Sequence, residues 1–339
     1  MQVINLACND DEKSFIMNRF KKMFSSSNIN ILLGSAFSLP YLKTLKDVEK
    51  NLSVAMELGD KDKECEIKKQ FFNESIYPIS TIDINDKEFK VKSSFLKTIC
   101  DILSLRETST VHKRLNIFTT NYDNLVEMVL EQNNIDYFDG FGGRVEPKFS
   151  TANFGKIITR QMELTGRISE IVTVNLYKLH GSIFWKQTDN VILFEDYKER
   201  FEKIKNSESD DDFLKNYEKL AIINPEKSKF NSTLLNSNYY DQIRMLANEL
   251  EKQNSLLLCF GFSFADEHIC QIIQRTIKSN PTLTIILFPY NSDDLERFNE
   301  IFNFDNNALA YVREKEEGIE DFTLDKLNEL VEEVYNGIK

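Results

Sequence analysis

The stretch N-L-Y-K-L-H-G-S-I-F-W, residues 175–185, decides the fold of this chain. Its apolar first half predicts a β-strand, and the strand ends in a histidine followed by glycine. A strand that ends in this way places an imidazole at the carboxyl edge of a sheet, where open α/β sheets bind their ligands. His180 is therefore the first candidate for a catalytic residue. The alternative is a histidine held in the core, which is the commoner role of a single histidine beside apolar residues.

A second stretch, L-N-I-F-T-T-N-Y-D at residues 115–123, is another short run of β-forming residues that ends in small and amide side chains. If the two strands are parallel neighbours, Asn121 and His180 face one crevice. The alternative for Asn121 is a cap on the helix that the pattern predicts from about residue 125, because asparagine is a favoured N-cap.

A third strand, predicted over residues 29–33, runs directly into the small residues G-S-A-F-S at 34–38. Nucleotide-binding folds use this arrangement for phosphates, because unhindered backbone amides at such a turn can point at an anion. An ordinary turn is the alternative for these residues.

Strands and helices alternate regularly in the last third of the chain. From residue 239 the pattern predicts a helix, a strand at 255–260, a helix, a strand at 282–288, a helix, a strand at 308–312 and a C-terminal helix. Repeated βα alternation predicts an α/β fold with a mainly parallel sheet and helices on both faces. We expect the core of this fold to comprise residues 26–40, 112–185 and 239–339, with a helical insertion at 41–111 and a second insertion at 186–238.

Composition excludes several classes of protein. With 339 residues, of which 41% are hydrophobic, the chain can fill a large core, and its net charge of −12 gives little reason to contact nucleic acid or an anionic membrane. No apolar stretch reaches the length of a membrane span and the first residues do not resemble a secretion signal, so we expect a cytoplasmic protein. Five cysteines without a C-x-x-C pair predict neither structural zinc nor a disulfide framework.

Four motifs that follow predicted strands occur in a characteristic order: G-S-A-F-S at 34–38, T-N-Y-D at 120–123, L-H-G-S at 179–182 and G-F-S at 261–263. This order resembles that of the sirtuin family, which carries G-A-G-x-S, T-Q-N-x-D, a catalytic H-G and G-T-S. The longer strings F-T-T-N-Y-D, K-L-H-G-S-I and G-F-S-F-A-D-E-H-I look more closely like the divergent bacterial sirtuin-like proteins that act in antiphage defence.

The resemblance implies a Rossmann-like domain that takes NAD as its substrate, with the dinucleotide lying across the carboxyl ends of the strands. It implies catalytic roles for Asn121 and His180. It also implies contacts to the phosphates from Gly34, Ser35, Ala36, Phe37 and Ser38, to the nicotinamide side from Thr120 and Asp123, and to the adenosine half from Gly261, Phe262 and Ser263.

Three departures from the sirtuin pattern bear on the activity. Ala36 stands where sirtuins usually have a second glycine, and the separation between Asn121 and His180 is longer than in the protein deacylases. The paired C-x-x-C zinc ligands that help deacylases form their acyl-lysine channel are missing, so we expect no metal and no zinc module. NAD⁺ glycohydrolase activity in antiphage defence is therefore the expected function, with NAD-dependent deacylation and a non-catalytic scaffold that binds NAD or ADP-ribose as alternatives. The resemblance further implies a homo-oligomer and a HerA-like ATPase partner.

Overall fold

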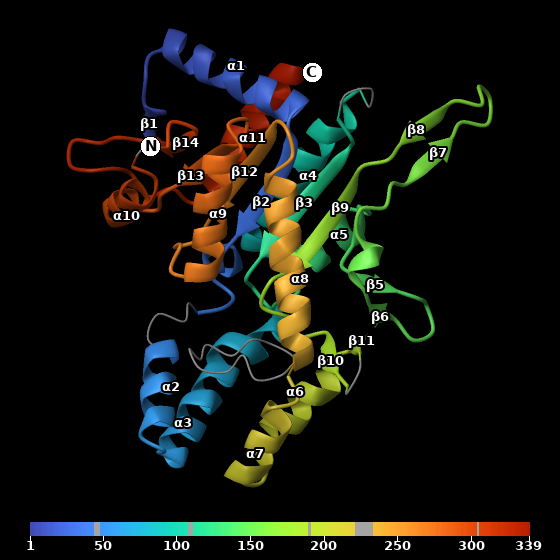
Figure 1. The fold of residues 1–339 in the computed structure, drawn as a ribbon, viewed down its shortest axis with the longest axis vertical. Helices are drawn as coiled ribbons and strands as arrows, with labels where there is room; N and C mark the ends of the chain where they lie inside the picture. The colour runs from blue at the N-terminus through green and yellow to red at the C-terminus, as the bar shows by residue number, and fades with distance from the viewer. Residues whose placement is uncertain (44–47, 108–110, 189–190, 221–232, 304) are drawn as a thin grey trace.

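Within the described residues, which are 1–43, 48–107, 111–188, 191–220, 233–303 and 305–339, the computed structural model has an eight-stranded sheet at its centre (Figure 1). The pairings between neighbouring strands of this sheet are all parallel. The predicted α/β class with a mainly parallel sheet is confirmed. In spatial order the strands are β1 (Gln2–Asn5), β14 (Ala308–Val312), β13 (Thr284–Phe288), β12 (Ser255–Phe260), β2 (Asn28–Leu33), β3 (Arg114–Thr119), β9 (Thr173–Lys178) and β4 (Asp136–Phe138).

Alternate residues of each strand face opposite sides of the sheet, and each side is covered by helices. In β2, Ile29, Ile31 and Leu33 belong to one apolar cluster, whereas Leu32 belongs to another. This two-residue period is the geometric consequence of an extended backbone. The first cluster includes buried residues of α1 (Asp10–Ser26), α4 (Lys87–Ser104), α5 (Leu125–Gln132) and α11 (Leu324–Ile338), and the second those of α8 (Thr233–Leu250), α9 (Glu267–Ser279) and α10 (Ser292–Phe302).

The strand order reverses between β2 and β12. From β2 the chain continues to β3 and β9 on one side, whereas β12 leads to β13 and β14 on the other. The helices that return the chain to the sheet also lie on different faces. After β2 that helix is α4, on one face, and after β12 it is α9, on the opposite face. Open α/β sheets bind ligands at such a reversal, beyond the carboxyl ends of the strands. The loops that follow β2 and β12 are therefore the first place to look for a site.

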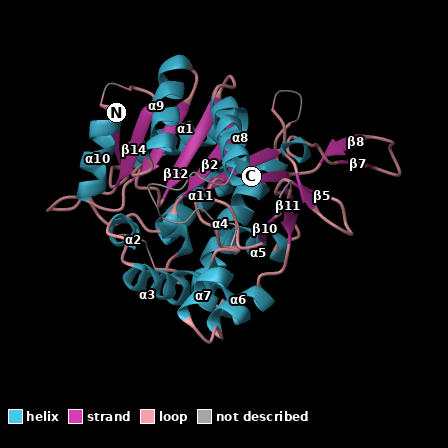
Figure 2. Cartoon of the chain, turned by 60° about the horizontal axis from the view of Figure 1, so that its bottom comes forward, coloured by secondary structure: helices cyan, strands magenta, loops and turns pink. Residues whose placement is uncertain are grey.

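A helical module lies beyond the carboxyl ends of the strands (Figure 2). It contains α2 (Val48–Glu57), α3 (Lys61–Phe71), α6 (Lys198–Lys205) and α7 (Asp210–Tyr217), and the last three share one aromatic core. Phe72, which follows α3, has its ring 5.6 Å from that of Phe201 and 6.3 Å from that of Phe213. Segments from both predicted insertions thus pack together, although residues 221–232 of the second insertion lie outside the described residues. Helix α4 falls within the predicted 41–111 insertion but packs on the sheet, and the domain boundaries stay a prediction.

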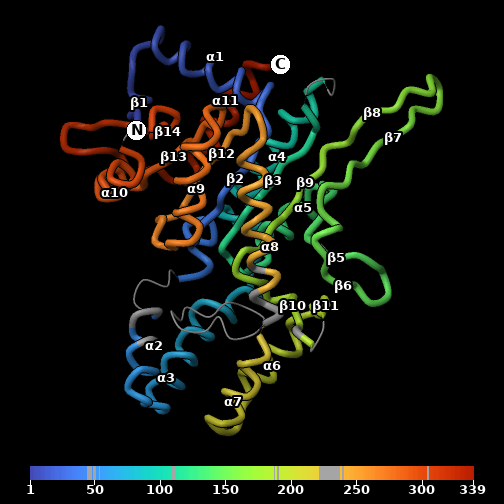
Figure 3. The backbone as a smooth tube through the Cα atoms, viewed as in Figure 1, coloured from blue at the N-terminus to red at the C-terminus, as the bar shows by residue number. Residues whose placement is uncertain are grey.

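Several short strands have no counterpart among the predicted elements. β5 (Phe141–Gly142), β6 (Lys148–Phe149), β10 (Trp185–Gln187) and β11 (Ile192–Phe194) form a small antiparallel sheet, and β7 (Thr159–Gln161) pairs with β8 (Ile168–Glu170). The β7–β8 hairpin projects away from the body of the molecule (Figure 3). Strands of two or three residues are too short to show a period in the sequence. Among the described residues, no helix combines the length and apolarity needed to cross a membrane.

Three buried asparagines form a hydrogen-bonded ladder across the middle of the large sheet. Asn30, Asn116 and Asn175 occupy matching positions in β2, β3 and β9. Asn175 Nδ2 donates to Asn116 Oδ1 at 2.9 Å, and Asn116 Nδ2 donates to Asn30 Oδ1 at 2.9 Å and to Glu249 Oε2 of α8 at 3.0 Å. A polar group that is buried without a partner is costly, so the ladder favours one register of these three strands.

Removing the central member of the ladder tests its contribution to stability. Asn116→Ala leaves polar atoms of Asn30 and Asn175 without their partner, and each unsatisfied buried group costs about 1–3 kcal/mol. We expect the free energy of unfolding, measured with urea, to fall by about 2 kcal/mol or more. The matched control is Asn206→Ala on the exposed end of α6, where a surface change should stay within about 0.5 kcal/mol. Equal effects of the two substitutions would show that the ladder contributes nothing.

Candidate active site

The loops that follow β2 and β12 touch each other closely. Gly34 N donates to Phe260 O at 3.0 Å, and Ala36 N donates to Gly261 O at 3.4 Å. A Cβ on Gly34 would lie 2.2 Å from Gly261 O, and a Cβ on Gly261 would lie 2.6 Å from Ala36 Cβ. Gly261 also has φ +65°, which favours glycine. The methyl of Ala36, the residue that departs from the sirtuin pattern, therefore packs against Gly261.

The side-chain amide of Asn121 holds the loop that follows β2. Asn121 Nδ2 donates to Gly34 O at 2.9 Å and to Ser38 Oγ at 2.8 Å. Its own backbone N–H donates to Thr119 Oγ1 at 3.0 Å, and that hydroxyl donates to Leu33 O at 3.0 Å. The alternative of a helix cap is wrong for Asn121, because the N-cap of α5 is Asn124.

Asp123 lies beneath the same loop rather than on its surface. Its side chain is buried, with Oδ2 accepting a short hydrogen bond from Ser38 Oγ and Oδ1 accepting from Leu125 N at 3.0 Å. Both carboxylate oxygens thus serve the protein itself and tie the loop after β2 to the start of α5. Thr120, one residue before Asn121, is half-buried. A contact from Thr120 or Asp123 to a ligand stays a prediction.

Two buried lysines support these turns, and no sequence pattern indicated either role. Lys178 Nζ, at the end of β9, pairs with Glu127 Oε2 at 3.0 Å and donates a short hydrogen bond to Asp123 O. Burial raises the pKa of Glu127 to about 7, although the positive charge of Lys178 opposes the shift. Lys92 of α4 donates to Leu39 O at 2.7 Å, and burial lowers its pKa.

His180 follows β9 and lies within hydrogen-bond distance of the residue that precedes α9. His180 Nε2 lies 3.0 Å from Asp266 Oδ2, and a quarter of the histidine side chain is exposed. Asp266 is the N-cap of α9, since its Oδ1 accepts from His268 N at 3.0 Å and from Ile269 N at 3.1 Å. Burial raises the pKa of Asp266, but the hydrogen bond and charge of His180 outweigh it, so that the net pKa lies below the ordinary value.

Sequence reasoning placed Asp266 inside the quoted string G-F-S-F-A-D-E-H-I but gave it no role. A capping position directly before a helix was the available signal. Its histidine partner comes from a strand three places away in the sheet, which no local pattern shows.

Comparison with known families identifies the fold. A family model described as a SIR2-like domain matches residues 115–307, more than half of the chain. The chain belongs to the SIR2-like family. A search of curated protein sequences finds no significant match.

A solved Sir2 structure has the same fold at low sequence identity. A structure of a mutant Sir2 with a p53 peptide and NAD has 14% identity and a TM-score of 0.51, covering 95% of this chain and 99% of that one. A structure described as a structural basis for the mechanism and regulation of Sir2 enzymes has 11% identity and a TM-score of 0.45, covering 95% of this chain and 98% of that one. The family-model match confirms the predicted sirtuin resemblance at the level of family.

The remaining predicted site residues of this SIR2-like chain divide into buried and accessible ones. Phe37 and Phe262 are buried in apolar clusters, and the ring of Phe262 lies 5.0 Å from that of Phe264. Their side chains are enclosed by the protein, and a contact from either residue to a ligand stays a prediction. Ser35 and Ser263 are exposed, and Ser263 O accepts from Arg297 Nη1 of α10 at 3.3 Å.

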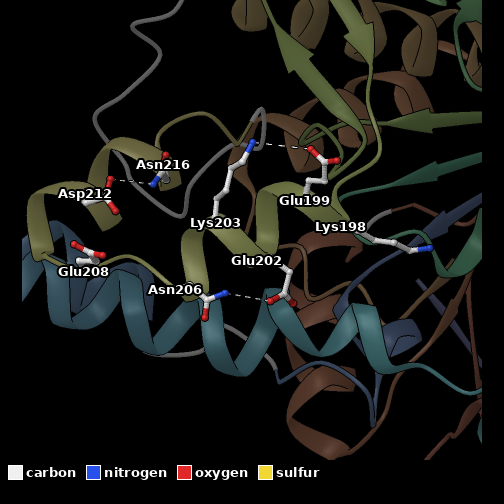
Figure 4. A pocket seen from close by; sticks show the side chains of 8 residues that line it. All are labelled: Lys198, Glu199, Glu202, Lys203, Asn206, Glu208, Asp212 and Asn216. Carbon is white, nitrogen blue, oxygen red and sulfur yellow. Dashed lines mark hydrogen bonds and ion pairs between the residues drawn. The ribbon is translucent and has the colours of Figure 1, made fainter.

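A hollow of about 680 Å³ lies elsewhere, on α6 and α7 (Figure 4). Charged and amide side chains line it, and they pair with one another: Glu202 with Asn206 at 3.3 Å and Asp212 with Asn216 at 3.2 Å. None of the predicted site residues lines this hollow. Its mutually paired, solvent-facing groups are typical of a hydrated surface, so we do not assign it the chemistry of the SIR2-like site.

The metal content of this SIR2-like chain stays a prediction. The described residues contain no group of three or more histidine, cysteine, aspartate or glutamate side chains that could hold a metal ion. We expect no stoichiometric zinc in the purified protein, and one zinc per chain in an elemental analysis would contradict this.

The contact between the two glycine loops can be tested with two alanine substitutions matched in backbone conformation. Gly261→Ala and Gly59→Ala both place a methyl on a residue with positive φ, at +65° and +69°. A Cβ on Gly59 meets nothing within 4 Å, whereas one on Gly261 meets Ala36. We expect Gly59→Ala to cost about 1 kcal/mol, the penalty for the left-handed conformation alone. Gly261→Ala should cost at least about 1 kcal/mol more in urea unfolding, because overpacking adds to it. Equal losses would show that the loops can separate freely.

Proposed function

We propose that this SIR2-like chain is an NAD⁺ glycohydrolase, which hydrolyses the bond between nicotinamide and ribose and releases ADP-ribose and nicotinamide. The observation that carries the proposal is the arrangement at the carboxyl edge of the sheet. There the side chain of Asn121, which follows β3, donates hydrogen bonds to Gly34 O and Ser38 Oγ. His180 follows β9, the neighbour of β3 in the sheet. The NAD in the structurally similar Sir2 complex supports NAD as the substrate.

The proposed binding mode follows from the position of the glycine loops at the strand-order reversal. A dinucleotide that crosses the carboxyl ends of β2 and β12 meets the loop at Gly34–Ser38 in the middle, where backbone N–H groups suit a pyrophosphate. The adenosine half then lies toward Gly261 and Ser263, and the nicotinamide ribose toward Asn121 and His180.

The two polar atoms of the Asn121 amide have different roles in this proposal: Nδ2 holds the loop and Oδ1 contacts the substrate or water. Positive charge builds on the ribose as neutral nicotinamide leaves, so the site must hold the ribose and orient a water. Because Nδ2 of Asn121 donates to Gly34 O and Ser38 Oγ, Oδ1 is the amide atom left to accept from a ribose hydroxyl or the attacking water. An amide oxygen does this without introducing a charge that must be desolvated.

His180 is the proposed proton acceptor. An imidazole nitrogen can accept a proton near neutral pH, which suits general base catalysis. It takes the proton from a ribose hydroxyl or from the attacking water as the new bond to ribose forms. The partly exposed side chain at the end of β9 allows a ligand to reach it.

The proposal includes the cellular setting that the sequence resemblance implies. There the chain acts in the cytoplasm of a bacterium, depletes NAD during antiphage defence, self-associates and works with a HerA-like ATPase. The projecting hairpin β7–β8 offers one surface for association, since Met162, Leu164 and Ile168 are exposed on it and exposed apolar groups mark contact sites. A monomer by light scattering across micromolar concentrations would contradict self-association.

Substitution of the two proposed catalytic residues tests the function. We expect His180→Ala to lower the rate of nicotinamide release by about 10² to 10⁴, the usual contribution of a general base, while NAD still binds in calorimetry. Asn121→Ala should lower the rate similarly and weaken NAD binding as well, because the loop at Gly34–Ser38 loses two hydrogen bonds. His112→Ala, an exposed histidine paired with Glu170, is the control and should keep full activity.

The assay is run both with and without infected-cell extract. An NAD hydrolase that is toxic to its own cell must stay inactive until a trigger is present, and the extract supplies that trigger. Release of nicotinamide only when an acylated peptide is added would establish deacylation instead. NAD binding without release under any condition would establish a scaffold. Equal specific activity of folded His180→Ala and the unsubstituted protein would refute the catalytic assignment.

A further inference from the structure

The contact between His180 and Asp266 joins two segments that follow different strands at the carboxyl edge of the sheet. β9 and β12, which precede these residues, are separated by β2 and β3. Neighbouring strands lie about 4.8 Å apart, so the ends of β9 and β12 are about 14 Å apart. The two side chains nevertheless approach to 3.0 Å. The segment from Gly261 to Asp266 and the side chain of His180 must therefore reach toward each other over the ends of the two intervening strands.

We infer that Asp266 is a positioning residue, whose carboxylate fixes the orientation and the tautomer of the His180 imidazole. The inference rests on the proposed function for the role of His180 as a base, and the geometry that carries it is independent of that role. Asp266 itself is not assigned a contact to the substrate.

The carboxylate is held rigidly enough for this role. Its Oδ1 accepts from two consecutive N–H groups in the first turn of α9, at 3.0 and 3.1 Å. The helix in turn is anchored by Ile269 and Ile273, which are fully buried against the sheet. Because the helix fixes Oδ1, the orientation of the whole carboxylate is restricted. In this orientation Oδ2 faces His180 Nε2.

The tautomer follows from the chemistry of the pair. An ionised carboxylate can only accept hydrogen bonds, so Nε2 must donate, and the neutral ring then carries its proton on Nε2 and presents Nδ1 as the acceptor. In the proposed reaction Nδ1 receives the proton, and the resulting imidazolium is stabilised by the negative charge 3.0 Å away. Carboxylates orient histidines in this way in other hydrolases.

A cap alone would explain the position of Asp266 equally well, so the test must separate capping from positioning. Asp266→Asn keeps an oxygen for the N–H groups of α9, because asparagine caps helices as well as aspartate does. It replaces the oxygen that faces His180 with an NH₂ donor, which favours the opposite tautomer. The matched control is Asp60→Asn, which changes the N-cap of α3, where the side chain accepts from Lys63 N at 3.1 Å.

The first readout does not depend on activity. Long-range proton–nitrogen NMR of protein labelled in its three histidines reports the tautomer of each ring, with His112→Ala and His268→Ala used for assignment. We expect His180 to carry its proton on Nε2 in the unsubstituted protein and on Nδ1 in Asp266→Asn, with no change in Asp60→Asn. The same tautomer in both proteins would overturn the inference, whether or not nicotinamide is released.

The second readout is the rate of nicotinamide release. We expect Asp266→Asn to lower kcat by about 10² to 10⁴ with little change in thermal stability or in KM for NAD. A loss no greater than that of Asp60→Asn would overturn the inference and leave Asp266 as a cap. A higher kcat or a lower KM would also overturn it, by showing that the pair hinders NAD from reaching the site. If the unsubstituted protein releases no nicotinamide, the proposed function fails while the NMR result still decides the inference.

Discussion

The close approach of the loops after β2 and β12 is the constraint on which the site depends. These strands are neighbours, and their loops diverge only after Gly34 and Gly261 have passed within contact distance. A side chain on either residue would collide with the other loop, and the collision at Gly34 is with backbone atoms that cannot move aside cheaply. The contact sets the height of the loop at Gly34–Ser38 above the sheet, and thereby the position of the groups that hold it.

Polar groups behind this loop hold it in place. Asn121 and Asp123 both bind Ser38, and Lys178 binds the backbone of Asp123 while pairing with Glu127. Burying such groups is costly unless each is satisfied, so they specify one arrangement of the turn after β3.

The sequence could predict the elements whose pattern is local. Four of the strands around the crevice are long, apolar and followed at once by small or polar residues, so β2, β3, β9 and β12 were each predicted within two residues of their observed bounds. The His180–Asp266 pair and the shared core of α3, α6 and α7 were not predictable, because they join segments that are distant in the chain. The edge strand β1 was missed for another reason: its four residues are only partly buried and show no apolar run.

The aromatic packing around Tyr122 gives the helical module a direct mechanical link to the site. Tyr122 follows Asn121, its ring lies 5.9 Å from that of Phe71 at the end of α3, and its hydroxyl donates to Ser75 O at 3.3 Å. Its carbonyl accepts from Ile183 N, three residues beyond His180. A displacement of the module would therefore move the backbone beside Asn121 and the backbone that follows His180 together. A molecule that binds to α3, α6 and α7 could change the positions of both residues in this way.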